Sequence, residues 1–467
     1  MTDQSRRRFL RSTTALAGAA LLAPSLQGLV ACAGATAASR SSGRRSTVPR
    51  RARPGNGGYG SLRSAGRELA LPEGFIYTVL SWTGKPMSDG TSTPCAFDGM
   101  AAFPLPNGNI RLVRNHENRD SPATARLKGD PAKAYDPLGG GGTTSLEVRI
   151  APDGTPELVR DFVSLSGTIV NCAGGPTPWG TWLSCEETTE GMVNGWGADH
   201  GYIFEVRASA EEERPAQPLK SMGRFVHEAV AVDPTTGIVY ETEDRQLSGF
   251  YRFLPTRPTA LAAGGKLQML AIDGQPNYDA ADGQRMGERL PAVWVDIDDA
   301  DPPGASVDTG AVFSQGFTKG GARFTRLEGC WWGDDGVFFH ATNGGDALCG
   351  QVWHYRPRGP DRGDLALVFE SPSPEMLDYP DNITVSPRGG IVICEDGGGT
   401  QFIRGLTRDG RIFDFAENRL NATEFAGACF APDGRTLFVN IMGSYVDAGQ
   451  EKGVTVAIRG PWEDGAL

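Results

Sequence analysis

The segment 171–187, NCAGGPTPWGTWLSCEE, combines residue types that could together hold a metal ion. Cys172 offers a thiolate near its beginning, and Glu186 and Glu187 offer carboxylates at its end. A thiolate with carboxylates is a mixed soft and hard ligand set. The Pro- and Gly-rich centre predicts a turn, and a hairpin would bring Cys172 and Glu187 to the same end of a sheet. The alternative is a buried free cysteine beside a solvated pair of carboxylates.

The pattern of this segment recurs along the chain. Each copy has a polar start, a short apolar run, a turn built from residues such as PNG, PWG, PTTG, DDG, PRGG or PDG, a second run and a polar end. The copies span residues 98–117, 171–187, 227–244, 328–343, 381–396 and 424–441. Six such segments predict six β-hairpins.

Hairpin geometry brings the start of the first strand and the end of the second strand together. If all six hairpins surround one channel, their polar ends open on one face, where buried carboxylates would repel one another unless cations bind. The expected start positions are Asp98, Asn171 with Cys172, His227 with Glu228, Glu328, Asp381 with Asn382, and Glu424. The expected end positions are Glu117, Glu186 with Glu187, Glu241 with Glu243, Asn343, Glu395 with Asp396, and Asn440. The alternative is that these residues cap strands and face water.

The elements that would position these residues indicate an all-β fold. The 467 residues include 63 Gly and 32 Pro, both above average usage, and short apolar runs lie between the turns. Six hairpins with further strands between them favour a six-bladed β-propeller with loop insertions. A β-sandwich or two stacked all-β domains would also give short strands, but neither explains six copies of one hairpin.

Charge and missing motifs narrow the function. The net charge of −11 argues against binding nucleic acid, because phosphate backbones require clustered Lys and Arg, whereas excess carboxylates suit cations. The chain has no Gly-x-Ser-x-Gly elbow, no His-Glu-x-x-His and no Walker loop. Metal-assisted hydrolysis therefore has more support than Ser/His nucleophilic catalysis.

The N-terminus predicts export. Residues 5–11, SRRRFLR, form a twin-arginine motif before an apolar run that Pro24 and Gln27 interrupt. We expect a signal peptide at 1–37, a disordered linker at 38–66 and a propeller domain at 67–467, in a periplasmic or extracellular monomer. Cys32 lies in a lipobox-like LVAC and could anchor the protein to a membrane as a lipoprotein, with ordinary cleavage near 35–37 as the alternative.

Several of these segments resemble the PhoX-type alkaline phosphatases. The matching motifs are NCAGGPTPWGTWLSCEE, FVHEAVAVDPTTGIVYETED, FTRLEG, DNITVSPRGGIVICEDGGG and EFAGACFAPDGRTLFVN. The resemblance covers about Leu71 to Ile441 and implies a six-bladed propeller that holds iron and calcium at one end of its channel. It also implies hydrolysis of small-molecule phosphomonoesters outside the cytoplasm.

The resemblance also implies roles for individual residues. It makes Cys172 a thiolate ligand of iron, with Glu243 and Glu328 as its carboxylates, and Glu187 a ligand of calcium. Arg326 would bind the phosphate, and its spacing of two from Glu328 puts both side chains on one face of a strand. By position in their hairpins, the further metal ligands would be Glu117, Glu395, Asp396 and Glu424.

One departure from the family leaves other functions open. The larger enzymes of the family also place a lysine before the cysteine, but this chain has no Lys between Lys133 and Lys220. A calcium-dependent propeller lactonase or phosphodiesterase, or a non-enzymatic binding propeller with structural metals, are the alternatives. Iron would distinguish the phosphatase, because calcium alone does not require the Cys172 thiolate.

Overall fold

A computed structural model describes residues 57–124, 129–333, 335–446 and 449–467, all within one compact unit, Ala52–Leu467. The predicted signal peptide, Cys32 and most of the predicted linker lie outside the described residues. Residues Leu62–Ser64, inside the segment predicted as a linker, form strand β1, because they pair with β2 (Leu69–Pro72). The described residues therefore include a strand before residue 67, where we predicted the domain to start.

The described chain is almost entirely β-structure, and every strand pair within its five sheets is antiparallel. One short α-helix, α2 (Ala311–Thr318), is found among the described residues. The 3₁₀ turns are Met192–Asn194, Lys220–Met222, Leu261–Ala263 and Trp462–Asp464. A search of the described part of the chain finds no helix with the length and apolar character that crossing a membrane requires.

Two of the sheets come from consecutive stretches of chain. The first contains β4 (Phe97–Pro104), β5 (Ile110–His116), β6 (Gly141–Ile150) and β7 (Pro156–Thr168). The second contains β8 (Asn171–Pro176), β9 (Thr181–Glu186) and β10 (Ile203–Arg207).

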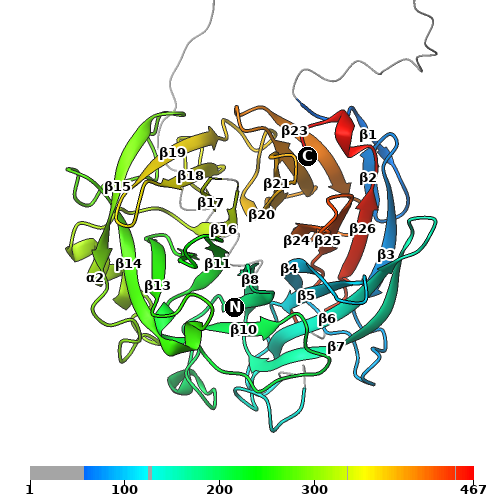
Figure 1. Ribbon diagram of the computed structural model, residues 1–467, viewed down its shortest axis with the longest axis horizontal. Coiled ribbons are helices and arrows are strands. Elements are labelled where there is room, and N and C mark those ends of the chain that lie inside the picture. Colours follow the sequence, from blue (N-terminus) through cyan, green and yellow to red (C-terminus); the bar gives the residue numbers. More distant parts are fainter. Residues whose placement is uncertain (1–56, 125–128, 334, 447–448) are drawn as a thin grey trace, which may run out of the picture. The chain divides into compact units, whose positions relative to one another are not determined.

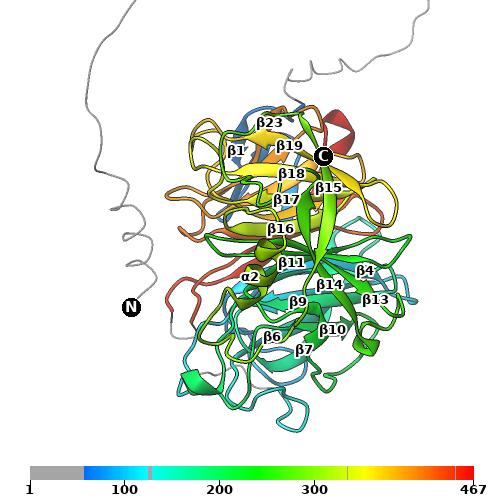
Figure 2. The same cartoon turned by 90° about the vertical axis from the view of Figure 1, so that its left-hand side faces the viewer.

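A nine-stranded sheet has the order β11-β12-β13-β14-β15-β19-β18-β17-β16. Its first half is β11 (His227–Val232), β12 (Val239–Glu243), β13 (Phe250–Pro255) and β14 (Gly265–Ile272). Its second half is β16 (Leu327–Trp332), β17 (Val337–Ala341), β18 (Gln351–Pro357) and β19 (Gly363–Glu370), which Figure 2 shows side by side. Strand β15 (Arg289–Asp296) pairs with both β14 and β19 and so joins the halves.

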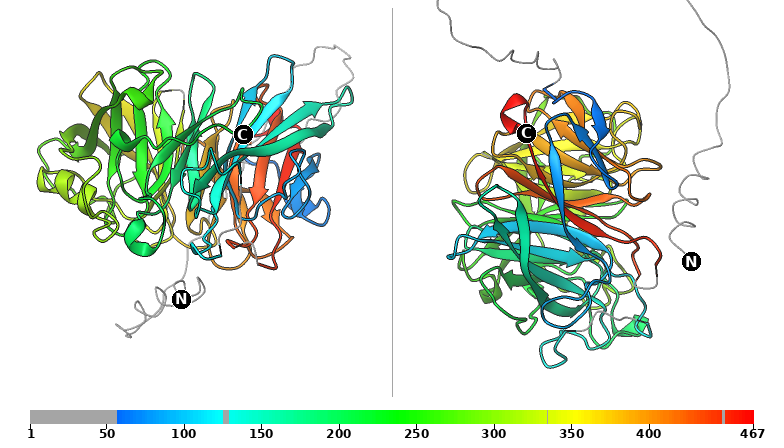
Figure 3. Two further views of the ribbon diagram at one scale, coloured as in Figure 1. Left: turned by 90° about the horizontal axis from the view of Figure 1, so that it is seen from below. Right: turned by 90° about the vertical axis from the view of Figure 1, so that its right-hand side faces the viewer.

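The last two sheets combine both ends of the described chain. Strands β1 and β2 extend the sheet of β20 (Pro380–Val385), β21 (Ile391–Glu395), β22 (Phe402–Leu406) and β23 (Ile412–Asn418). Strand β3 (Ile76–Trp82) pairs with β26 (Val454–Arg459), next to β25 (Thr436–Ile441) and β24 (Phe425–Phe430). Figure 3 shows the C-terminal strands, in red, beside N-terminal strands, in blue.

The sheets surround a centre in a propeller-like arrangement. All six predicted hairpins form, and the first strand of each lies nearest the centre, whereas β3, β7, β14 and β15 lie at the periphery (Figure 1). The six inner strands contact one another in a closed circuit: β4 with β8, β8 with β11, β11 with β16, β16 with β20, β20 with β24, and β24 with β4.

Small residues let these inner strands approach closely. The third residues of the inner strands line a narrow central pocket: Gly99, Ala173, Ala229, Gly329, Asn382 and Gly427. A Cβ at Gly99 would lie 2.6 Å from the Cα of Ala173, and one at Gly427 would collide with the carbonyl oxygen of Asp98. The centre is therefore packed at this level, and the apolar core lies in layers between neighbouring sheets.

Each inner strand carries a β-bulge close to its start. The register shifts between Phe97 and Met100 in β4, and equivalent shifts occur in β8, β11, β16, β20 and β24. A bulge bends its strand and re-aims the side chains beside it. All six bulges therefore lie at the same end of the ring, where the polar residues of the hairpins gather.

Candidate metal centre

Carboxylates and one thiol meet at this end of the ring. They form four groups of three, and within each group one ligand atom from every residue lies within 4.8 Å of the others. Neighbouring groups share a residue, so the four are continuous; we call their nine members the central cluster. The groups are Asp98, Glu117 and Cys172; Cys172, Glu187 and Glu228; Glu228, Glu328 and Asp381; and Asp381, Asp396 and Glu424.

Two repeated positions in the hairpins supply almost all of the central cluster. The second residue of an inner strand, just before its bulge, supplies Asp98, Cys172, Glu228, Glu328 and Asp381. The residue directly after the second strand supplies Glu117, Glu187 and Asp396. Glu424 is the exception, since it directly precedes β24. Equivalent backbone positions therefore recur in the hairpins around the ring, and different ligand residues occupy them.

The alternation of side chains along a strand places two predicted ligands outside the central cluster. Glu243 and Glu395 are the last residues of their strands and lie outside the four groups, because successive side chains point to opposite faces. Glu243 instead accepts hydrogen bonds from the Tyr251 hydroxyl at 2.7 Å and from the Gly249 amide at 3.0 Å. Glu395 accepts one from Nε of Arg404 at 2.7 Å.

Asp244, which follows β12, faces the central cluster where Glu243 was predicted. Arg326 binds it with a two-pronged contact, donating from Nε at 2.9 Å and from Nη2 at 2.8 Å. Nη2 of Arg326 also donates to Glu328 at 2.8 Å, so these two residues share a face as the sequence predicted. Although burial opposes ionisation of Asp244, the Arg326 guanidinium holds its pKa below the ordinary value.

A second guanidinium, that of Arg119, also reaches the central cluster. It forms ion pairs with Glu117 and Glu187. Neither Arg119 nor Asp244 was predicted from the sequence. The available signal was that both are charged residues one to three positions beyond the end of a predicted second strand.

Burial and mutual repulsion raise the pKa values of the cluster and so favour its protonated forms when no cation is bound. Burial, reinforced by neighbouring carboxylates, raises the pKa of Asp381 to about 7. The pKa of the Cys172 thiol is also raised, first by burial and then by Asp98 and Glu228. The same causes raise the pKa values of Asp98, Glu117, Glu187, Glu228, Glu328 and Glu424. Bound cations would replace these protons and relieve the repulsion.

The donors of the central cluster fit metal ions. Both carboxylate oxygens of Glu228 are buried, and neither has a nitrogen or hydroxyl donor in contact among the described residues. Such a group is costly to bury unless a cation or a proton compensates its charge. Oxygen donors suit calcium, and the addition of the Cys172 sulfur suits a transition metal such as iron.

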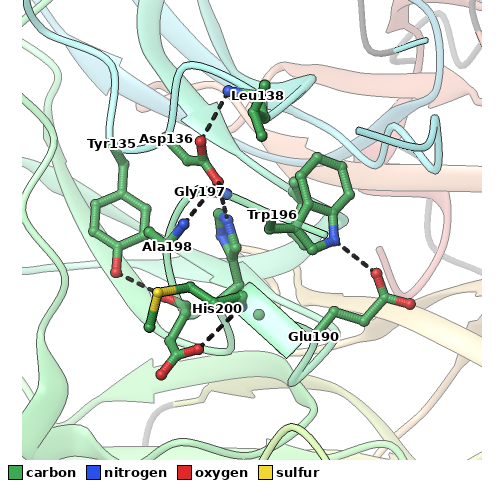
Figure 4. A network of polar contacts seen from close by, with 12 residues as sticks. Tyr135, Asp136, Leu138, Glu190, Trp196, Gly197, Ala198 and His200 are labelled. Atoms are coloured by element: carbon green, nitrogen blue, oxygen red, sulfur yellow. Dashed lines mark hydrogen bonds and ion pairs between the residues drawn. The ribbon is translucent and has the colours of Figure 1, made fainter. Parts of the chain in front are cut away.

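A network of polar contacts surrounds His200 (Figure 4). Glu186 points to the opposite face from Glu187, and its Oε1 lies 2.6 Å from Nδ1 of His200. Nε2 of His200 lies 3.3 Å from Oδ2 of Asp136. Burial opposes the charged imidazole, but the two carboxylates overcome this effect and raise the pKa of His200 to about 9.

Glu186 connects this network to the chain that carries Cys172. Its Oε1 accepts a hydrogen bond from the amide of Ile169 at 3.0 Å, and its Oε2 accepts one from the amide of Gly201 at 2.8 Å. Val170, which follows Ile169, has a φ of +50°, and its carbonyl oxygen accepts a hydrogen bond from the amide of Glu187 at 2.8 Å. The His200 network thus fixes the two strand ends that present Cys172 and Glu187.

Most predicted site residues come together in this arrangement. The structure places seven of them in or against the central cluster and leaves Glu243 and Glu395 outside it. The seven are Cys172, Glu187, Glu328, Glu117, Asp396, Glu424 and, through its contacts with Asp244 and Glu328, Arg326.

Comparison with known proteins agrees with the fold. A family model described as alkaline phosphatase PhoX matches residues 58–444. Among solved structures, Pseudomonas fluorescens PhoX in complex with vanadate, a transition-state analogue, has a TM-score of 0.68 and 18% sequence identity, covering 87% of this chain and 98% of that chain. A Xanthomonas campestris gluconolactonase has a TM-score of 0.41 and 12% identity, covering 85% and 99%. A search of curated proteins gives no match.

Proposed function

The chain belongs to the PhoX family of alkaline phosphatases, and from that premise we propose that its central cluster binds iron and calcium and hydrolyses small phosphomonoesters. One observation carries the proposal: nine ligand residues, including one thiol, form a continuous cluster at one end of a ring, and six of them are buried while the other three are half-buried. The Pseudomonas fluorescens protein of the same fold binds vanadate, and phosphate esters are the corresponding substrates for this chain.

We propose that the ring has six blades. Its support is the closed circuit of six inner strands, one from each hairpin. The nine-stranded sheet then counts as two blades, β11 to β14 and β16 to β19, which β15 joins at the periphery.

The ligands divide by chemistry. Cys172 would bind iron, with Glu328 as a carboxylate ligand, because thiolate favours the softer metal, and Glu187 would bind calcium. Asp381, Asp396 and Glu424 offer oxygen donors alone and would bind calcium. When bound, the metal ions neutralise charge on the phosphate and act as Lewis acids.

Arg326 is positioned to orient the ester. Its guanidinium is held by Asp244 and Glu328, so its direction is fixed before substrate arrives. Planar guanidinium donors match the oxygens of a phosphate, and they would stabilise the charge that builds up on those oxygens during transfer. Burial opposes the charge of Arg326, but Asp244 and Glu328 overcome this effect and raise its pKa well above the ordinary value.

The decisive experiment measures metal content and activity together in the exported protein. We expect iron and calcium by elemental analysis and turnover of p-nitrophenyl phosphate. Cys172→Ala should lose iron and lower kcat by at least about 100-fold, as removal of a preorganised charge-stabilising group does. Cys429→Ala, at a buried cysteine in the apolar core, is the matched control and should keep both. Full iron content and full turnover in Cys172→Ala would refute the proposed centre.

The proposal places this activity outside the cytoplasm. Its support is the twin-arginine motif at residues 5–11, a signal for the export of folded proteins. Lipidation at Cys32 would then keep the enzyme at a membrane surface, and a monomer would suffice, because all nine ligands come from one chain.

A further inference from the structure

Arg119 approaches the central cluster from a different hairpin than Arg326. It lies three residues beyond β5, and its Nη2 atom forms both ion pairs, with Glu117 and with Glu187. Nη1 and Nε belong to the same planar group and point to other directions. A guanidinium has five N–H donors, so these contacts use a minor part of its capacity.

The loop after β25 fixes the position of Arg119. The amide of Arg119 donates to the carbonyl oxygen of Tyr445 at 2.9 Å. The guanidinium carbon lies 5.4 Å from the centre of the Tyr445 ring, within the range of a cation–π contact. The Tyr445 hydroxyl in turn donates to Glu424 at 3.1 Å. Arg119 is thus held by contacts that remain in place when Glu117 and Glu187 engage other partners.

The two guanidiniums are more open to solvent than the carboxylates they contact. The side chain of Arg119 is 36% exposed, against 3% for Glu117 and 11% for Glu187. The side chain of Arg326 is 26% exposed, against 10% for Asp244 and 6% for Glu328. An anion that enters from solvent therefore meets positive charge before it meets the buried carboxylates.

Arg119 and Arg326 flank the same pair of carboxylates. Glu187 binds Arg119 and lies against Asp244, and Asp244 binds Arg326. The positive charge of Arg119 also favours the ionised form of Asp244. The two guanidiniums therefore lie at the ends of one chain of contacts, Arg119–Glu187–Asp244–Arg326, and both have the planar donors that suit the oxygens of a phosphate group.

We propose that Arg119 is a second phosphate-binding residue, which donates to ester oxygens that Arg326 does not reach. The inference rests on the proposed function and identifies the substrate group that this side of the site recognises: a phosphate dianion. Metal ions at Glu117 and Glu187 would take over the negative charge that Arg119 now pairs with, and its donors would face the ester.

The test compares Arg119→Ala and Arg119→Lys with the wild-type holoenzyme. The readouts are the inhibition constant of inorganic phosphate, KM and kcat for p-nitrophenyl phosphate, and iron and calcium content. Loss of a charge-assisted hydrogen bond should weaken phosphate binding by about 10-fold or more in Arg119→Ala, with metal content unchanged. Arg119→Lys keeps the charge without the planar donors and should recover part of the binding.

Arg149→Ala, which removes an exposed arginine paired with Glu157, is the control and should behave as wild type. The inference is overturned if Arg119→Ala keeps its metals and binds phosphate as tightly as wild type. It is also overturned if metal is lost along with phosphate binding, because Arg119 would then act only through Glu117 and Glu187. A wild-type protein that neither binds phosphate nor turns over the ester would refute the proposed function itself.

Discussion

At the level of single residues, the alternation of side chains along a strand decides which acidic residue faces the central cluster. The pairs Glu186–Glu187, Glu243–Asp244 and Glu395–Asp396 each end a second strand, and in each pair the later residue faces the central cluster. Neighbouring carboxylates with the same chemistry therefore have different roles. The earlier residue supports the backbone from the opposite face, as Glu186 does through the amides of Ile169 and Gly201.

Neutralising each carboxylate of one such pair in turn tests whether the two residues have different roles. Asp244→Asn removes the carboxylate that fixes Arg326, so we expect KM for p-nitrophenyl phosphate to rise by about 10-fold, the effect of one charge-assisted hydrogen bond. Glu243→Gln should leave KM and metal content close to wild type, because Glu243 contacts Tyr251 and Gly249 rather than the cluster. Steady-state kinetics with elemental analysis measure both. Loss of iron in Glu243→Gln would restore Glu243 as a ligand.

The sequence shows which residue types could bind a metal, but it does not show which of two neighbouring side chains faces the cluster. Turn chemistry identifies the hairpins, and hairpin geometry brings Cys172, Glu187 and Glu328 together. Which of Glu243 and Asp244 faces inward depends on the last residue of β12 and on the bulge in β11, where the register shifts between His227 and Val230. A bulge adds one residue to one strand, and β11, with the sequence HEAVAV, has no glycine that would mark it.

At the level of elements, the His200 network joins three segments that the pairing of strands within one hairpin would not bring together. Asp136 comes from the connection between β5 and β6, His200 precedes β10, and Glu186 ends β9. Tyr135 adds a hydrogen bond from its hydroxyl to the carbonyl oxygen of Asp199 at 2.7 Å. The sequence placed Glu186 beside the site as a residue that could face solvent, but could not reveal partners so distant along the chain.

The charge of His200 makes the stability of this network depend on pH. Its pKa is raised from 6.5 to about 9 in the folded protein, so the stabilisation is complete below about pH 6.5 and is lost as the pH rises through 9. The raised pKa corresponds to a contribution on the order of 3 kcal/mol to the free energy of unfolding. His200→Gln should lack this dependence. The free energies of unfolding of the two proteins, measured by chemical denaturation, should therefore differ widely at pH 6 and little at pH 10. An unchanged difference at both values would contradict a charged His200.

At the level of the whole molecule, the ring depends on how closely its inner strands approach. Gly427 has a φ of +60°, and its Cα faces the carbonyl oxygen of Asp98 across the contact between β24 and β4. The recurrence of hairpins predicted a ring. Its closure through β3 and β26, and the joining of two halves through β15, are pairings between distant segments that no local pattern specifies.

A methyl group at this contact should open the ring slightly. Gly427→Ala is expected to lower the free energy of unfolding by about 1–3 kcal/mol beyond the cost of its positive φ, as overpacking does. Gly108→Ala is the matched control, because Gly108 also has a positive φ, of +84°, but a Cβ there would meet nothing within 4 Å. Thermal unfolding of both variants isolates the steric part. Equal midpoints would show that the inner strands adjust without cost.

The pairing of β3 with β26 also has a consequence for biosynthesis. Residues Ile76–Trp82 leave the ribosome well before their partner, Val454–Arg459, is translated. Until that partner emerges, β3 has an unpaired edge, and unpaired strand edges are the sites at which nascent chains associate wrongly. Closure of the ring through this pair therefore has to wait for β26, and the unpaired strand β3 is where we expect a chaperone to act.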